Sequence, residues 1–140
     1  MLLLEARNAT NVRNEFSQFV DDVVRERPQA VKRNRDHFWS ISDEMVDVIL
    51  EQINFSLTYD IDEDGQYSGY INEIDDLVFY GSTKEEMIQD AANQLLEYTL
   101  DYFNNFQRYF NAPNRKKHFI YVWKVANQQS LNEVLKLINA

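Results

Sequence analysis

The chain is poor in the residues that build covalent links and cofactor-holding loops. Its 140 residues include no cysteine, three glycines and two prolines. Without cysteine there is no disulfide and no thiolate metal site, and with so few glycines there is no glycine-rich phosphate loop. No membrane span is visible, and the opening Met1-Leu2-Leu3-Leu4 is far too short for a signal sequence. We therefore expect a cytoplasmic protein with no cofactor and no membrane partner.

Apolar residues and acidic charge are plentiful. Hydrophobic residues make up 44% of the chain and aromatic residues 14%, enough for a buried core in one ordinary domain or two small ones. The formal net charge is -9 and is unevenly spread: residues 55–110 hold 2 Lys and Arg against 12 Asp and Glu, whereas residues 111–140 hold 5 against 1. The acidic middle would repel phosphates, so it favours a basic protein partner.

One basic run stands out against this charge. Lys32-Arg33-Asn34-Arg35 places three cations in four residues. The flanking pattern predicts two short strands, 29–32 and 37–41, joined by a tight turn at residues 33–36. A basic hairpin tip is suited to the DNA backbone, although a solvated polar turn would have the same composition.

The residues around this hairpin predict a small N-terminal module. Residues 2–6 are expected to form a strand. A helix is expected from Asn11 to Pro28, with one apolar face made of Val12, Phe16, Phe19, Val20, Val23 and Val24. Ser42 is a suitable N-cap for a further helix that carries Met45, Val48, Ile49 and Ile53.

The second half predicts a sheet followed by helices. Residues 55–61, 67–74 and 77–80 read as three strands, with a hairpin turn at Asp64-Gly65. Capping patterns at residues 82–86 start a helix of about 28 residues that Pro113 closes. A last strand is predicted at 118–125, and Ser130 with Glu133 caps a short terminal helix.

Few residues suggest chemistry. Asp60, Asp62, Asp64 and Gly65 match the first half of an EF-hand calcium loop, but the twelfth position is Ile71, so we interpret the segment as an acidic β-turn and expect no metal. His37 and His118 lack paired ligands at metal spacing, and no nucleophile with its base can be recognised. We expect no enzyme. A nuclease that uses Asp60, Asp62, Asp64 or Glu73 is a third reading, and the pattern argues against it because these carboxylates cluster at a turn with no recognisable metal triad.

The aromatic face of the predicted long helix has two readings. Covering the sheet is the simpler one. Such a helix would nevertheless be far longer than a five-residue strand, so its end would overhang and its aromatic residues could anchor a partner. The residues expected to do so are Tyr102, Phe106, Tyr109 and Phe110.

The N-terminal motifs, over about residues 1–52, resemble the DNA-binding module of Phd/YefM-type antitoxins. The matching segments are Arg13-Asn14-Glu15-Phe16-Ser17, Lys32-Arg33 and Ser42-Asp43-Glu44-Met45. Two features depart from that family: the hairpin has no glycine, and His37-Phe38-Trp39 replaces its usual small aliphatic run. The resemblance implies a homodimer that grips operator DNA, with Arg13 and Arg33 at the positions of DNA-contacting arginines. The DNA contacts expected in all are Arg7, Arg13, Lys32, Arg33, Asn34 and Arg35.

The second half, over about residues 55–125, resembles HicB-type antitoxin domains, which have a degenerate RNase H-like fold. The matching segments are Asp62-Glu63-Asp64-Gly65 with Tyr67, Ile71-Asn72-Glu73-Ile74, and Gly81 to Met87. The family's Pro and Gly-Cys near the second strand are absent. The resemblance implies an α+β chain, with a β-α-β-β-α module over residues 1–53 and a βββαβ(α) module over residues 54–140.

Together these features predict an antitoxin of a type II toxin–antitoxin system. Its first module would dimerise and repress its own operon, and its acidic second module would neutralise a small basic toxin, a ribonuclease. A stand-alone transcriptional regulator or protein-interaction adaptor without a toxin is the alternative. A neighbouring reading frame for a basic protein of toxin size would distinguish the two.

Overall fold

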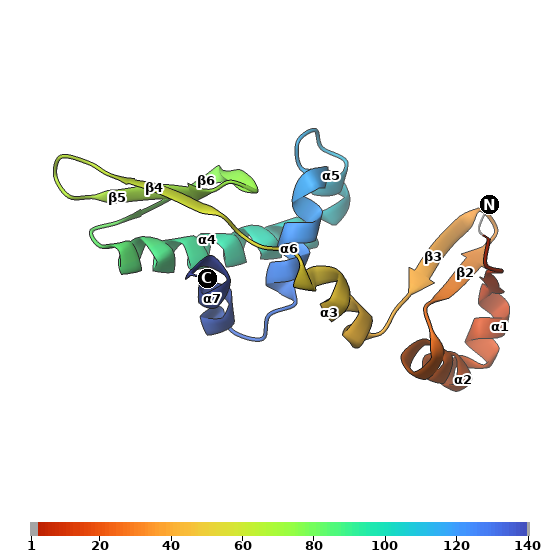
Figure 1. The fold of residues 1–140 in the computed structure, drawn as a ribbon. Coiled ribbons are helices and arrows are strands. Elements are labelled where there is room, and N and C mark those ends of the chain that lie inside the picture. Colours follow the sequence, from red (N-terminus) through yellow and green to blue (C-terminus); the bar gives the residue numbers. More distant parts are fainter. Residues whose placement is uncertain (1–2, 140) are drawn as a thin grey trace. The chain divides into compact units, whose positions relative to one another are not determined.

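The computed structural model describes residues 3–139, and the chain divides into two compact units, Met1–Ile49 and Leu50–Ala140. Each unit has its own three-stranded sheet (Figure 1). Helix α3, Asp43–Glu51, carries the boundary between them. Its N-terminus is capped as the sequence predicts, because the Ser42 hydroxyl accepts a 3.3 Å hydrogen bond from the Met45 N–H.

The first unit packs a broken helix on a small sheet. Its strands are β1 (Arg7–Asn8), β2 (Gln29–Arg33) and β3 (Asp36–Ser40), in the order β1-β2-β3. Strand β1 runs parallel to β2, and β2 pairs with β3 as the predicted hairpin. The helical stretch consists of α1 (Ala9–Asn14), α2 (Phe16–Asp21) and the π-helix η1 (Asp22–Glu26). The core residues are Val12, Phe19, Val23 and Val31.

Two expectations for this unit are wrong. The strand predicted at residues 2–6 lies instead at Arg7–Asn8, since residues 3–6 are irregular and residue 2 is outside the described residues. The single helix predicted after Asn11 is interrupted at Glu15, whose backbone leaves the helical region at φ -124° and ψ 42°.

The second unit has an antiparallel sheet in the order β4-β5-β6. The strands are β4 (Leu57–Ile61), β5 (Tyr67–Ile71) and β6 (Ile74–Gly81). Helix α4, Lys84–Asn104, covers one face of this sheet (Figure 1). It begins as predicted, because the Thr83 hydroxyl accepts a 3.1 Å hydrogen bond from the Glu86 N–H. Fully buried residues at this contact include Ile71, Ile74, Phe79, Met87 and Leu95.

After α4, the regular elements of the described residues are all helices. Short helices α5 (Phe106–Phe110) and η2 (Lys116–His118) lead to α6 (Phe119–Ala126) and α7 (Leu131–Asn139). The predicted long helix therefore ends at Asn105. The strand predicted at 118–125 is wrong, because that segment is helix α6, and its buried residues His118, Val122 and Val125 repeat with helical spacing. The second unit is thus βββα followed by helices, without the fourth strand of the expected βββαβ(α) order.

Candidate functional site

The basic hairpin tip in the first unit is exposed to solvent. Arg33 pairs with Asp36 at 3.0 Å, but both side chains are more than two-thirds exposed, so water screens the pair. Asn34 holds the turn with φ 55°, a left-handed conformation that asparagine tolerates better than most residues. In residues 3–139, neither Lys32 nor Arg35 makes an ion pair. All four residues of the tip, 32–35, are exposed to solvent.

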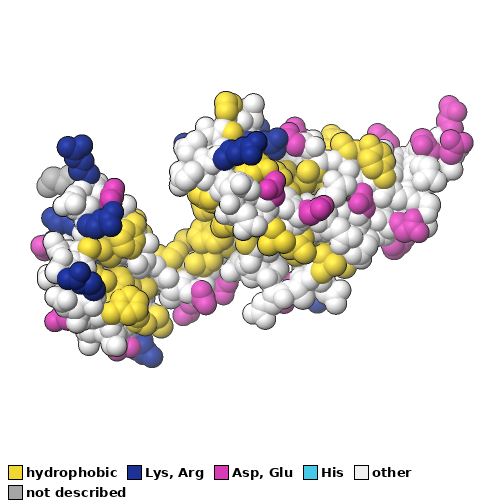
Figure 2. Space-filling model, turned by 180° about the vertical axis from the view of Figure 1, so that it is seen from behind, with side chains coloured by type: hydrophobic (Ala, Val, Ile, Leu, Met, Phe, Trp, Pro, Cys, Tyr) yellow, Lys and Arg dark blue, Asp and Glu magenta, His cyan; other side chains and the backbone are white. Residues whose placement is uncertain are grey.

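Strand pairing places this hairpin beside the start of α1. Lys32 in β2 lies opposite Asn8 in β1, and the Asn8 side chain caps α1 by accepting a 2.8 Å hydrogen bond from the Thr10 N–H. Arg13, exposed and without an ion pair in the described chain, lies in the last turn of α1. Figure 2 shows Lys and Arg side chains on this unit next to a hydrophobic patch.

Arg7 is engaged inside the first unit. Its guanidinium donates a 2.7 Å hydrogen bond to Asp22 and lies 5.2 Å from the centre of the Phe19 ring. Hydrogen bonds from Gln18 and then from Arg7 hold the pKa of Asp22 below its ordinary value. Arg7 thus links β1 to η1 through Asp22. The sequence analysis had placed Arg7 among the expected DNA contacts.

An apolar strip on the helical stretch was not recognised from the sequence. Phe16, Val20 and Val24 are 61%, 39% and 51% exposed. Their four-residue spacing puts them on one side of the helical stretch, while Val12, Phe19 and Val23 face the core. The sequence had placed all six residues on one apolar face. On β3, Phe38 and Trp39 are also about half exposed, so the small unit leaves much of its apolar surface uncovered.

The acidic segment of the second unit is a hairpin turn, as predicted. It joins β4 to β5, and Gly65 has φ 80°. The Asp62 carboxylate accepts hydrogen bonds from the N–H groups of Asp64 and Gln66, each at 2.9 Å. This carboxylate therefore stabilises the turn itself.

The carboxylates considered for nuclease chemistry are not assembled in one place. Glu73, between β5 and β6, accepts a 2.5 Å hydrogen bond from the Ser56 N–H. Within residues 3–139, no three His, Asp or Glu side chains are grouped so that they could hold a metal ion. No helix in the same part of the chain is long and apolar enough to cross a bilayer.

The aromatic residues near the end of α4 pack on one another and on the core. Tyr102 is fully buried, and its hydroxyl donates a 2.8 Å hydrogen bond to the Arg115 carbonyl. Its ring stacks on Tyr109 at 5.1 Å between centroids, and Phe106 and Phe110 stack at 5.4 Å. After the break at Asn105, Phe106 and Tyr109 pack against the buried core of the second unit. Tyr102 is a core residue, and the other three are half-buried.

The same region contains a buried polar network. The Tyr98 hydroxyl lies 2.7 Å from Nδ1 of His118 and receives a 3.2 Å hydrogen bond from Arg115. Arg115 also forms an ion pair with Asp76 of β6. Burial lowers the pKa of His118 and raises that of Tyr98. The network ties the segment before α6 to both α4 and the sheet.

Comparison with known proteins identifies the family. Residues 1–140 match the PHD-like family, described as antitoxins of RelE/RelB toxin–antitoxin systems. A crystal structure from Syntrophomonas wolfei subsp. wolfei, described as the antitoxin part of a proposed toxin–antitoxin system, is 41% identical, covers 96% of each chain and superposes with a TM-score of 0.87. No curated protein matches the sequence. The chain therefore belongs to the PHD-like family of antitoxins.

Proposed function

We propose that the second unit neutralises a small basic toxin with ribonuclease activity. Membership of an antitoxin family carries this proposal, and the charge of residues 55–110, with 2 cations against 12 anions, supports it. A toxin that grips RNA needs a basic surface, because RNA carries one negative charge per phosphate. An acidic protein surface competes for the same cations, so neutralisation needs binding and no reaction. The chain acts as a partner protein and not as an enzyme.

The first unit serves, in this proposal, as a homodimer that binds operator DNA. The exposed cations Arg13, Lys32, Arg33 and Arg35, with Asn34 at the turn, form its DNA-facing set. Arg7 is left out because Asp22 and Phe19 already engage its guanidinium. The apolar strip of Phe16, Val20 and Val24 supports the dimer, since apolar surface of this kind is covered in stable assemblies. The complex would work in the cytoplasm, where its operator and its toxin both lie.

Co-expression with the small basic protein encoded in the adjacent reading frame tests the toxin proposal. We expect that protein alone to stop growth, and growth to return when this chain is induced. The two proteins should also co-purify. A matched control uses residues 1–49 alone, which lack the acidic unit. Rescue by this fragment, or no growth defect from the neighbouring protein, would favour the stand-alone regulator instead.

A further inference from the structure

The two edges of the β4-β5-β6 sheet are built differently. At the β6 edge, side chains from α4 form hydrogen bonds with two backbone groups of the strand. Asp90 accepts a 2.9 Å hydrogen bond from the Tyr80 N–H, and Gln94 donates one of 2.9 Å to the Val78 carbonyl. A paired edge of this kind resists the addition of another strand. The β6 edge is therefore closed by the protein's own helix.

The β4 edge is open. In an antiparallel pair of strands, residues that exchange backbone hydrogen bonds alternate with residues that do not. The Asn72 N–H donates to the Ser56 carbonyl and the Asp62 N–H to the Gln66 carbonyl, so the even-numbered residues of β4 are the ones bonded to β5. In that alternation, Leu57, Tyr59 and Ile61 direct their backbone N–H and C=O groups away from β5. No other segment among residues 3–139 pairs with this edge. The segment predicted as a fourth strand adds no strand to this sheet, because it forms helix α6.

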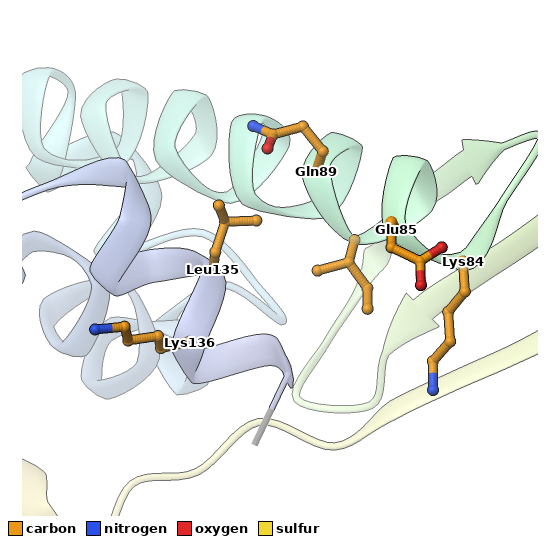
Figure 3. Close-up of a pocket in the computed structure, with 6 residues that line it drawn as sticks. Lys84, Glu85, Gln89, Leu135 and Lys136 are labelled. Atoms are coloured by element: carbon orange, nitrogen blue, oxygen red, sulfur yellow. The ribbon is translucent and has the colours of Figure 1, made fainter.

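The second unit has an open hollow beside the start of α4. It has a volume of about 380 Å³ and lies between the start of α4, with Lys84 and Ile88, and α7, with Leu135 (Figure 3). Lys84 connects the hollow to the strand, because its Nζ lies 5.2 Å from the centre of the Tyr59 ring. Tyr59 and Ile61 are 38% and 55% exposed. A strand added here would direct every second side chain toward this hollow.

Charge identifies the kind of strand that fits. Asp60 lies on the opposite face of β4 from Tyr59, and the adjoining turn adds Asp62, Glu63 and Asp64. An added strand would complement this edge if it carried Lys or Arg on the face of Asp60 and an apolar residue on the opposite face, toward the hollow. A second copy fits poorly, because unit Leu50–Ala140 has 7 Lys and Arg against 14 Asp and Glu and would repel itself.

We infer that β4 is the docking strand for the toxin, whose extended basic segment pairs antiparallel or parallel with the outward groups of Leu57, Tyr59 and Ile61. This inference rests on the proposed antitoxin function. Main-chain hydrogen bonds supply affinity in such strand addition, and the alternating side chains supply selectivity.

Hydrogen exchange of the intact chain, alone and bound to the basic protein of the adjacent reading frame, tests this directly. The amides of Leu57, Tyr59 and Ile61 should exchange freely in the chain alone and at least about tenfold more slowly in the complex. A tight complex that leaves these three amides unprotected would refute the docking strand and leave the antitoxin function standing. Absence of any complex would overturn both. Protection that rises with the concentration of the chain alone would instead identify a second copy.

Two variants sharpen the test. Ile61→Pro removes one outward donor at an edge position, where proline leaves the ladder to β5 intact. Asp60→Arg reverses the charge on the outer face. Each should weaken toxin binding at least about tenfold, whereas Val78→Lys on the closed β6 edge should leave it unchanged. Thermal unfolding of each variant checks folding. Equal losses from Val78→Lys and Asp60→Arg would contradict the inference.

Discussion

The hydroxyl of Tyr98 lies 2.7 Å from Nδ1 of the buried His118. Arg115 donates a hydrogen bond to the same hydroxyl, and in the neutral His118 tautomer with its proton on Nε2 the Tyr98 hydroxyl donates to Nδ1. Protonation of His118 would remove that acceptor and place a second cation beside Arg115. The segment between α5 and α6 thus contacts the core through a histidine whose pKa is lowered by burial, which favours its neutral form.

Stability should therefore fall as the pH falls below about 6.5, the ordinary pKa of histidine. Burial lowers the pKa of His118 in the folded chain, so the unfolded chain binds the proton first. The free energy of unfolding then decreases with falling pH, by at most about 1.4 kcal/mol per pH unit, until the pH passes the folded pKa. Urea unfolding at several pH values between 5 and 8 measures this slope.

Two matched variants test whether His118 causes the pH dependence of the free energy of unfolding. His118→Asn keeps an acceptor near Nδ1 but cannot titrate, so it should unfold more easily at pH 7 and lose most of the pH dependence. His37→Asn, at an exposed position of the basic hairpin, is the matched histidine-to-asparagine control. Glu86, whose pKa is lowered by hydrogen bonds from Ser82, acts only in the more acidic range of carboxyl groups. An unchanged slope in His118→Asn would contradict the assignment.

Local signals predicted the helix starts and the turns. Ser42, Thr83 and Ser130 each accept the N–H hydrogen bond of a helix N-terminus, and Asp64-Gly65 forms the β4–β5 turn. These features depend on a few neighbouring residues, so sequence is sufficient to find them. The basic hairpin tip belongs to the same class, since Arg33 and Asp36 were placed at its turn.

Features decided by distant packing were missed. The segment 119–126 is rich in aromatic and branched residues, which favour a strand locally, but its contacts with α4 select a helix.

The break at Asn105 has a local cause that was overlooked: its side chain donates to the Asp101 carbonyl and carboxylate. Such bonds compete with the helical backbone. The apolar strip around Phe16 was not separated from the core residues, because the sequence pattern placed both sets on one apolar face.

DNA binding should depend on the three exposed arginines of the first unit. Replacing Arg13, Arg33 and Arg35 by alanine is expected to weaken operator binding and to reduce the slope of log K against log salt by about 2 to 3, since each phosphate contact contributes about 0.9. Titrations at 50 to 200 mM salt measure the slope. The triple variant Arg108→Ala, Lys116→Ala and Lys117→Ala removes the same charge from the second unit and should leave the slope unchanged. Equal slopes in wild type and the first triple variant would exclude these contacts.

Dimerisation should depend on the apolar strip. Phe16→Glu with Val20→Glu places two charges on exposed positions, so the fold should survive while the strip can no longer pack against a partner. We expect light scattering to give the mass of a monomer, against a dimer for the wild type. Val48→Glu is the control, because Val48 is 63% exposed on α3 and lies outside the strip. A dimer that persists in the double variant would place the interface elsewhere.

The aromatic cluster at the end of α4 should stabilise the fold without binding the toxin directly. Tyr102→Phe removes the hydroxyl that donates to the Arg115 carbonyl, at an expected cost of about 1 kcal/mol. Tyr102→Ala leaves a large cavity in the core and should cost about 3 to 5 kcal/mol. Phe110→Ala should cost less, because Phe110 is only half-buried. Urea unfolding gives the three values. Toxin affinity should be measured under conditions where Tyr102→Phe remains folded, and we expect it to equal that of the wild type. A tenfold loss of affinity would show that Tyr102 contacts the toxin.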